Sequence, residues 1–292
     1  MKESLSYLAY LAGWKLIGIL PESSAYALFR YLARRMYRAN GKSVRRLRTN
    51  LSIVRPGQTS LDLELLVMRG LESYMRYWCD TFRIHKWSPE RIEATVTTTN
   101  DHLLREPMAQ GRGVVIALPH SGNWDHAGAY FCQQGIPLVT VAEVLKPELL
   151  FQKFLQYRTS MGFEVLALDS RAFATLNKRA REKRLIALVA DRDLSESGIP
   201  VSFFNRATRM PAGPALLSIK SGLPLVVAHI AYQNEGIHIH FTEIDPWQSG
   251  SEEERISRTV QAIASEFEKG ISAHPEDWHM LQKIWLEEGL YQ

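Results

Sequence analysis

The stretch Gly113–Gly128, GVVIALPHSGNWDHAG, organises the rest of the chain. Its first part, Gly113–Leu118, is a short apolar and β-branched run, which is typical of a strand buried on both faces of a sheet. Pro119 and a polar turn follow, and a helix is expected after them. His120 therefore stands at the carboxyl end of a strand, where ligands collect in open α/β sheets because the strand fixes the residue and the loop stays accessible.

Asp125 follows His120 by five positions. On one continuous helix, residues at this spacing lie about 140° apart and do not meet. A turn through Gly122 can instead fold the carboxylate back onto the imidazole, so that Asp125 accepts one ring proton and the other nitrogen acts as a base. An unperturbed histidine pKa of about 6.5 suits that role. The spacing leaves two interpretations open: a catalytic His120–Asp125 dyad, or a structural role in which Asn123 or Asp125 caps the helix and His120 only ends the strand.

The composition indicates one globular unit, since 292 residues with 46 % hydrophobic content can bury one large α/β core. Within it, residues 1–60 are expected to form amphipathic and basic helices that associate with a membrane, and residues 61–292 the α/β core. Cys79 and Cys132 lack the C-x-x-C spacing of a metal or redox site, so no metal is expected. A reduced, cytosolic setting fits them.

Positive charge is concentrated near the N-terminus, although the formal net charge is only +4. No acidic residue lies between Ser23 and Leu61. The basic residues of this block are Arg30, Arg34, Arg35, Arg38, Lys42, Arg45, Arg46, Arg48 and Arg55. Such a block predicts an anionic partner, either phospholipid headgroups or nucleic-acid phosphates. We expect Arg34, Arg35 and Arg38 to meet a membrane.

The segment Tyr7–Leu20 favours the membrane over nucleic acid. It is apolar and aromatic, but Lys15 interrupts it and it is shorter than the roughly 20 residues that span a bilayer. A cleaved signal peptide is not expected, because Glu3 stands where a basic start is required. An apolar, aromatic helix beside a basic one is typical of helices in the membrane interface, and no base-reading motif accompanies it. The alternative is that Tyr7–Leu20 packs on the protein's own core.

Helical periodicity predicts a long helix over Leu61–Thr81. Farther along, strands and helices alternate, which predicts an α/β fold with a central, mostly parallel sheet flanked by helices. The expected strands are Arg91–Thr99, Gly113–Leu118, Pro137–Ala142, Phe163–Leu168, Leu185–Ala190, Leu223–Ala231 and Gly236–Thr242. The expected helices are Asp101–Gln110, Trp124–Gly135, Lys146–Met161, Arg171–Lys183, Ser218–Gly222 and Ser257–Ile271.

A second charged cluster follows a buried strand. Leu185–Ala190 is wholly apolar and ends in Asp191, Arg192 and Asp193, which repeats the placement of His120. We expect these side chains to line the same cleft. A solvated loop is the alternative.

Arg209 stands before a predicted helix start that Pro211 and Pro214 mark. Together with the helix amides it is expected to form a site for an anion, such as the phosphates of a bound substrate or a phospholipid headgroup. An ion pair with Asp191 or Asp193 is the alternative.

Three further features receive structural interpretations. His238 and His240 alternate on a predicted strand without a third ligand at suitable spacing, so a metal site is not expected. His229 is expected in the core. Phe203-Phe204 is also expected there, with an acyl groove as the alternative.

The sequence HSGNWD resembles the histidine-four-residues-aspartate box of the lysophospholipid acyltransferases, in the form found in the lipid A late acyltransferase branch. Together with ADRD, FFNRATRMPAGP and PEDWHMLQ, it is most similar to the actinobacterial phosphatidylinositol mannoside acyltransferases. The resemblance spans most of the chain. It implies a peripheral protein on the cytoplasmic face of the inner membrane that moves a palmitoyl group from palmitoyl-CoA to a mannose hydroxyl.

The residues suit that chemistry. His120 is expected to take the proton of the attacking hydroxyl, Asp125 to stabilise the imidazolium, and donors around Gly122-Asn123 to meet the oxyanion. Acyl-CoA serves as co-substrate, and no covalent acyl-enzyme or other cofactor is expected. The residues expected to position substrates are Asn123, Asp191, Arg192 and Arg209. In some members of the resembled group a glutamate of the site stands at the position of Asp191, which is one methylene shorter.

Other classes fit less well. The G-x-S-x-G elbow of α/β-hydrolases and the G-x-G-x-x-G of Rossmann enzymes are missing from the sequence. A lipid A-type or lysophospholipid acceptor is the alternative within the same chemistry. A non-enzymatic protein that binds anionic membranes is the alternative outside it.

Overall fold

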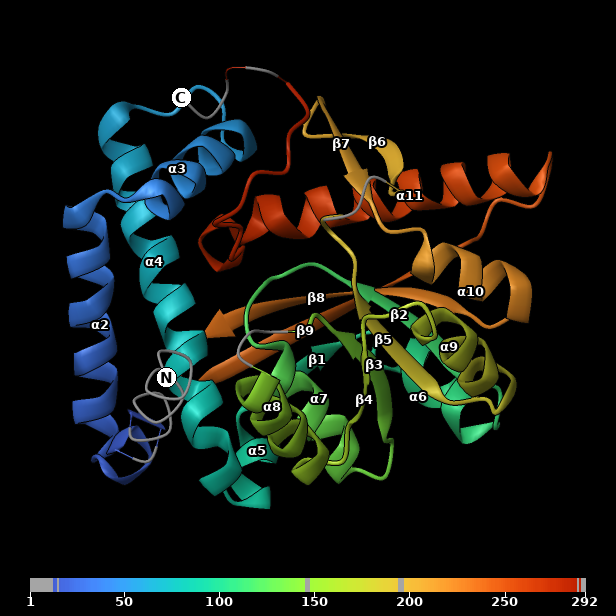
Figure 1. The fold of residues 1–292 in the computed structure, drawn as a ribbon, viewed down its shortest axis with the longest axis horizontal. Helices are drawn as coiled ribbons and strands as arrows, with labels where there is room; N and C mark the ends of the chain where they lie inside the picture. Colours follow the sequence, from blue (N-terminus) through green and yellow to red (C-terminus); the bar gives the residue numbers. More distant parts are fainter. Residues whose placement is uncertain (1–12, 15, 145–147, 194–196, 288, 290–292) are drawn as a thin grey trace.

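A central sheet positions the residues of interest in the computed structural model, which describes residues 13–14, 16–144, 148–193, 197–287 and 289 (Figure 1). Among these residues, the sheet order is β1-β9-β8-β2-β5-β3-β4, and each neighbouring pair is parallel except β8 with β9. The strands are β1 (Val96–Thr99), β2 (Val114–Leu118), β3 (Leu138–Ala142), β4 (Glu164–Ala167), β5 (Leu185–Val189), β8 (Leu225–Gln233) and β9 (Gly236–Ile244). The predicted mostly parallel sheet is confirmed.

Helices cover both faces of the sheet (Figure 1). One face meets α5 (Pro89–Ala94), α6 (His102–Ala109) and α7 (Trp124–Gln133), and the other meets α9 (Ala172–Arg181), α10 (Gly213–Ser221) and α11 (Glu252–Ala273). The remaining helices are α2 (Glu22–Ala39), α3 (Lys42–Val54), α4 (Ser60–Arg83) and α8 (Glu148–Ser160), of which α2 and α3 pack on α4 at one side of the sheet.

The central strand β2 explains why its sequence is apolar throughout. All five of its residues are buried. Val114, Ile116 and Leu118 face one hydrophobic core, whereas Val115 and Ala117 face the other. Because successive side chains of a strand point to opposite faces, a strand between two helical layers needs apolar residues at every position.

Two local expectations are wrong. The N-terminal half of Arg91–Thr99 is helical, because Ser88 caps α5 by accepting a hydrogen bond from the Arg91 amide and Pro89 stands in its first turn. The segment before α10 forms a hairpin of β6 (Ile199–Phe203) and β7 (Arg206–Met210), where no strand was expected. Its turn places two non-glycine residues at positive φ, which the sequence does not signal.

The membrane role of the N-terminal helices stays a prediction. Half of Tyr7–Leu20, namely residues 7–12 and Lys15, lies outside the described residues, as does Lys146. Trp14 is 7 % exposed and packs against Phe82, while Leu16 and Ile19 are exposed. None of the described helices has the length and apolar composition needed to cross a bilayer.

Candidate active site

His120 pairs with Asp191 at the carboxyl ends of two adjacent strands. β2 and β5 lie side by side with Leu118 opposite Val189, so the residues that follow each strand meet. The His120 Nδ1 atom lies 2.5 Å from Asp191 Oδ1, and the His120 amide donates to Asp191 Oδ2 at 3.0 Å. The imidazole side chain is 25 % exposed, whereas the carboxylate is fully buried. One edge of a rigidly held histidine therefore faces the outside.

The surroundings of Asp191 keep it ionised. Burial on its own raises the pKa of this carboxyl, but the neighbouring His120 charge and the hydrogen bonds from His120 and Trp278 outweigh it, so the pKa lies below its ordinary value. Trp278 Nε1 donates to Asp191 Oδ2 at 2.8 Å. An ionised Asp191 fixes the proton on His120 Nδ1 and leaves Nε2 as the basic nitrogen.

The predicted hydrogen bond between His120 and Asp125 is not formed. Asp125 is the second residue of α7, its side chain is 1 % exposed, and it accepts hydrogen bonds from Arg158 Nε at 2.8 Å and the Tyr77 hydroxyl at 3.1 Å. The first turn of α7 directs the carboxylate toward α4 and α8. The carboxylate that meets the imidazole comes instead from the neighbouring strand, through Asp191.

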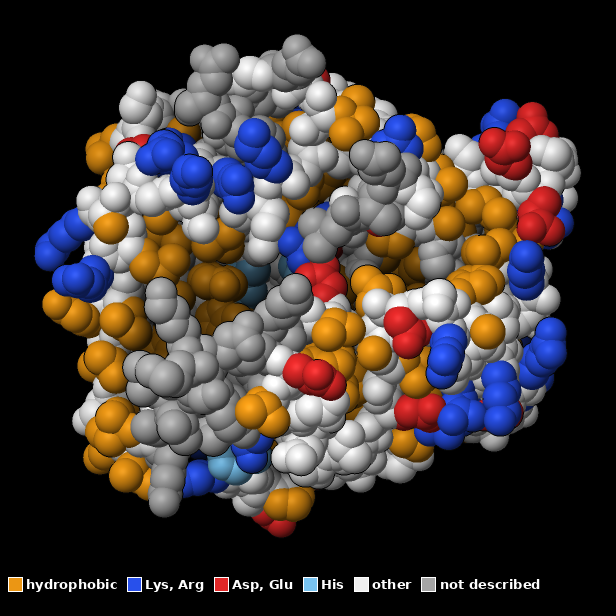
Figure 2. Space-filling model, viewed as in Figure 1, with side chains coloured by type: hydrophobic (Ala, Val, Ile, Leu, Met, Phe, Trp, Pro, Cys, Tyr) orange, Lys and Arg blue, Asp and Glu red, His pale blue; other side chains and the backbone are white. Residues whose placement is uncertain are grey.

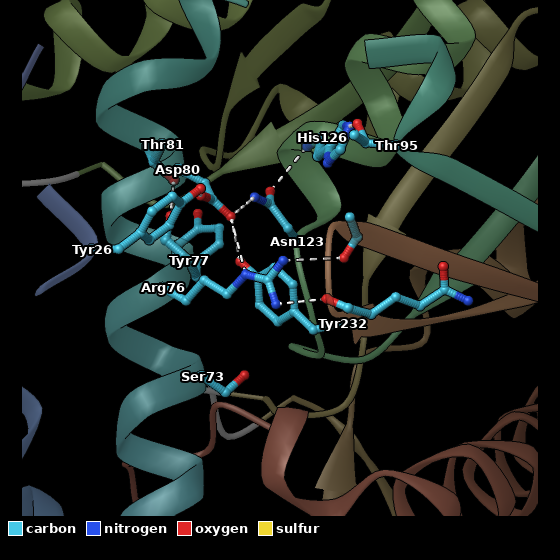
Figure 3. A network of polar contacts seen from close by, with 12 residues as sticks. Tyr26, Ser73, Arg76, Tyr77, Asp80, Thr81, Thr95, Asn123, His126 and Tyr232 are labelled. Carbon is cyan, nitrogen blue, oxygen red and sulfur yellow. Dashed lines mark hydrogen bonds and ion pairs between the residues drawn. The ribbon is translucent and has the colours of Figure 1, made fainter. Parts of the chain in front are cut away.

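Asn123 faces a buried polar network on α4 (Figure 3). Its Oδ1 accepts the His126 amide at 2.9 Å, which caps α7, and its Nδ2 donates to Asp80 Oδ2 at 3.3 Å. The Gly122 amide donates to the Asp277 carbonyl at 2.9 Å. Two of the donors that the sequence suggested for an oxyanion or a substrate, the Gly122 amide and the Asn123 side-chain amide, therefore already donate hydrogen bonds within the protein.

The two predicted arginines occupy different places. Arg192 follows Asp191 directly, is largely buried, and pairs with Glu143 at the end of β3, Nη2 to Oε1 at 3.1 Å. Arg209 lies on β7 and donates from Nη1 to the Gly198 carbonyl at 2.9 Å. Its expected place beside the helix amides of α10 stays a prediction. Through its hydrogen bond to Gly198, Arg209 holds the segment that follows Asp191.

The C-terminal segment supplies residues that the sequence reasoning did not assign to the site. Ser121 pairs with Trp278 in an isolated bridge, and the His279 amide donates to the His120 carbonyl at 2.8 Å. The Asp277 carboxylate accepts Ser73 Oγ of α4 at 2.6 Å. Burial and the nearby His120 lower the pKa of His279 to about 3. The proline-acid-aromatic motif of this segment was the available signal, but nothing in its spacing places it beside a loop about 160 residues earlier.

Aromatic rings border the imidazole. Trp124 meets His120 edge to face with centroids 5.6 Å apart, and Tyr77 lies 4.3 Å from Trp124. Figure 2 shows a hollow on the side of α4, with hydrophobic side chains along its wall and Lys and Arg side chains above it over α3. A partly exposed base bordered by aromatic rings suits a substrate that joins a polar reacting group to a hydrocarbon chain.

The arrangement favours proton transfer by His120 over covalent catalysis by Ser121. Ser121 is fully buried, and its Oγ donates to the Ile230 carbonyl at 2.9 Å, so it does not face the outside as a nucleophile. His229 is also buried, as expected, and lies 3.3 Å from that Oγ through Nε2. The described residues contain no group of histidine, cysteine or acidic side chains arranged for a metal ion.

Known proteins that are similar to this chain are acyltransferases. Residues 2–287 match the family model described as bacterial lipid A biosynthesis acyltransferase. The phosphatidylinositol mannoside acyltransferase of Mycolicibacterium smegmatis is 40 % identical over 284 residues, which cover 96 % of this chain and 91 % of that protein. The protein of the same name from Mycobacterium tuberculosis is 39 % identical over 285 residues, covering 95 % and 88 %.

Proposed function

We propose a specific reaction for this chain, which belongs to the bacterial lipid A biosynthesis acyltransferase family and is an acyltransferase. It transfers a long-chain acyl group, preferably palmitoyl, from acyl-CoA to a mannose hydroxyl of a phosphatidylinositol mannoside. The acceptor follows from the names of the two mycobacterial relatives. The observation that carries the proposal is the partly exposed His120 imidazole fixed by the buried Asp191 carboxylate.

His120 acts as general base and then as general acid. Its Nε2 takes the proton of the mannose hydroxyl while that oxygen attacks the thioester carbonyl, and a new C–O bond forms. The C–S bond then breaks, and the imidazolium returns the proton to the sulfur of the leaving CoA. Asp191 stabilises the imidazolium throughout, and no acyl group is attached to the protein. Ester and free CoA are the products.

Asp125 has a different role in this proposal. Its carboxylate and the Arg158 guanidinium join α7 to α8, next to the Trp124 ring that borders His120. It therefore shapes the cleft rather than acting on the imidazole. Arg192 directly follows Asp191 in the chain and is proposed to meet substrate phosphate when its pair with Glu143 opens.

The protein works as a peripheral protein on the cytoplasmic face of the inner membrane. Arg34, Arg35 and Arg38 are exposed on α2, next to an exposed Tyr31. Tyr31, Arg35 and Arg38 line a shallow hollow of about 360 Å³. Exposed Leu61 and Leu65 of α4 add apolar surface. Cationic and apolar side chains on one group of helices suit an anionic lipid surface.

The test is release of free CoA by purified protein given palmitoyl-CoA. Release is expected to depend on a phosphatidylinositol mannoside acceptor. It is expected to fall at least about 10³-fold in His120→Ala and also in Asp191→Asn. The second substitution removes the charge of the partner carboxylate but keeps its shape. Asp125→Asn should lose less activity than Asp191→Asn. If Asp125→Asn lost as much as His120→Ala while Asp191→Asn stayed active, the assignment of the base's partner would be overturned.

Parallel assays with other acceptors distinguish the proposed substrate from its alternatives. Lysophospholipid and a lipid A precursor are offered in place of the mannoside, each in the same detergent. If CoA were released faster with either of these lipids than with the mannoside, that lipid would be assigned as the acceptor instead. No release with any acceptor, together with vesicle binding that His120→Ala leaves unchanged, would favour a non-enzymatic membrane protein.

A further inference from the structure

Asp80 of α4 is a buried carboxylate that the proposed reaction does not use. Its side chain is 2 % exposed. Among the described residues, the nearest cation is Arg76, whose Nε lies 4.0 Å from Asp80 Oδ2 while its Nη1 donates to the Gln233 carbonyl at 2.7 Å. Burial raises the pKa of Asp80, against hydrogen bonds that lower it. Burying a carboxylate costs free energy unless hydrogen bonds compensate for the lost water. The groups that donate hydrogen bonds to Asp80 therefore indicate which parts of the fold it holds together.

The donors come from three separate parts of the fold (Figure 3). Oδ1 accepts from the Tyr26 hydroxyl of α2 at 2.5 Å. Oδ2 accepts from the Tyr232 hydroxyl of β8 at 3.0 Å and from Asn123 Nδ2 at 3.3 Å. Asp80 thus joins α2 and β8 to Asn123, the residue that caps the start of α7.

Asn123 connects this carboxylate to the loop that carries His120. Its Oδ1 accepts the His126 amide, so only one orientation of the side-chain amide satisfies both contacts. The residue before it, Gly122, has φ +59°, and a Cβ there would lie 2.5 Å from the Ile230 carbonyl oxygen. The loop is therefore pressed onto β8 on one side and held by Asp80 on the other, three residues after His120.

We propose that Asp80 is a positioning residue for acyl transfer. Through Asn123 it fixes the start of α7, and thereby the direction in which His120 Nε2 faces the acceptor hydroxyl; this rests on the proposed role of His120 as base. Asp80 does not touch the substrate. Because a misplacement of about 1 Å can cost about 10²-fold in rate, loss of this contact lowers kcat and leaves the KM for acyl-CoA nearly unchanged.

An exchange of the two side chains tests the proposal. Asn123→Asp places a second carboxylate against Asp80 and is expected to lower kcat at least about tenfold at neutral pH. The deficit should shrink as pH falls, since one carboxyl takes up a proton and the hydrogen bond re-forms. Adding Asp80→Asn restores a carboxylate–amide pair in reverse order, and aspartate also caps helices well. In the double variant kcat is expected to return to within about threefold of wild type.

Tyr26→Phe is the matched control. It removes a different hydrogen bond from the same carboxylate and leaves Asn123 untouched. It is expected to lower the unfolding temperature while kcat stays within about twofold of wild type, measured well below that temperature. A kcat loss in Tyr26→Phe equal to that of Asn123→Asp would overturn the proposal, because the carboxylate would then act only through the stability of the network.

A second readout does not depend on the reaction. The short His120–Asp191 hydrogen bond should give a downfield Nδ1 proton signal by NMR, assigned by its loss in Asp191→Asn. The signal is expected to shift or broaden in Asn123→Asp and to recover in the exchanged double variant. An unchanged signal and wild-type kcat in Asn123→Asp would overturn the proposal. Recovery of the signal in a protein that transfers no acyl group would instead refute the proposed function and leave the positioning role supported.

Discussion

Arg158 holds Asp125 through two parallel contacts, Nε to Oδ1 at 2.8 Å and Nη2 to Oδ2 at 3.3 Å, between α8 and α7. The carboxylate side chain is 1 % exposed and the arginine side chain 17 %. This fork is a buried ion pair, unlike the exposed pairs on the helix surfaces. It fixes the helix that begins beside His120, so its loss has consequences for both stability and the cleft.

Arg158→Met is expected to lower the free energy of unfolding by about 3–5 kcal/mol, because it leaves the Asp125 charge buried with the Tyr77 hydroxyl as its one remaining hydrogen-bond donor among the described residues. Chemical denaturation followed by tryptophan fluorescence measures the change. Lys178→Ala is the control, since its contact with Glu182 is exposed, 4.0 Å long and expected to contribute less than about 1 kcal/mol. Equal effects of the two substitutions would contradict the buried pair's role.

Gly122→Ala is expected to damage the site far more than its size suggests. Its φ of +59° is unfavourable for alanine, and the added Cβ meets backbone of Ile230 that cannot move alone. Gly135→Ala has the same kind of strain at φ +78° but meets no atom within 4 Å. Steady-state kinetics should show at least about a tenfold loss of kcat for Gly122→Ala, through displacement of His120, and little change for Gly135→Ala. Similar kcat values in the two variants would argue against a tightly fitted loop.

His126 makes the fold sensitive to acid. Burial lowers the pKa of this histidine to about 4, from an ordinary value of 6.5. The unfolded chain therefore binds a proton at a higher pH than the folded chain, so the stabilising contribution is complete above pH 6.5 and is lost as pH falls toward 4. The complete pKa shift of His126 corresponds to a loss of about 3 kcal/mol in the free energy of unfolding. Unfolding free energies measured from pH 7 to 5 should fall less steeply in His126→Gln than in wild type, and identical slopes would refute this.

Arg35 and Arg38 are expected to dominate attraction to anionic vesicles. Each basic residue near such a surface contributes about 1 kcal/mol, so the double change to glutamine should weaken partitioning about 30-fold. Arg112 and Arg181 are exposed elsewhere on the molecule, and changing both to glutamine removes the same charge. Sedimentation with vesicles containing anionic phospholipid compares the two pairs. Equal losses would show that net charge, and not the α2 surface, governs binding.

The sequence by itself determined the local elements around the site. The apolar run of β2, the turn through Gly122 and the start of α7 follow from side-chain alternation and capping, which act over a few residues. The placement of His120 at a strand end followed from them. Expectations failed where local signals compete, as at Arg91–Thr99, whose first half is drawn into a helix by the cap at Ser88.

Only the tertiary structure decided which carboxylate meets the imidazole. Asp125 is close to His120 in sequence but is turned away by the helix on which it lies, whereas Asp191 is 71 positions distant and is brought to the ring by the pairing of β2 with β5. The same holds for Trp278, and for the engagement of Asn123 by Asp80. Strand order and buried polar pairing depend on how all the elements pack together, and no local pattern of residue types encodes that free energy.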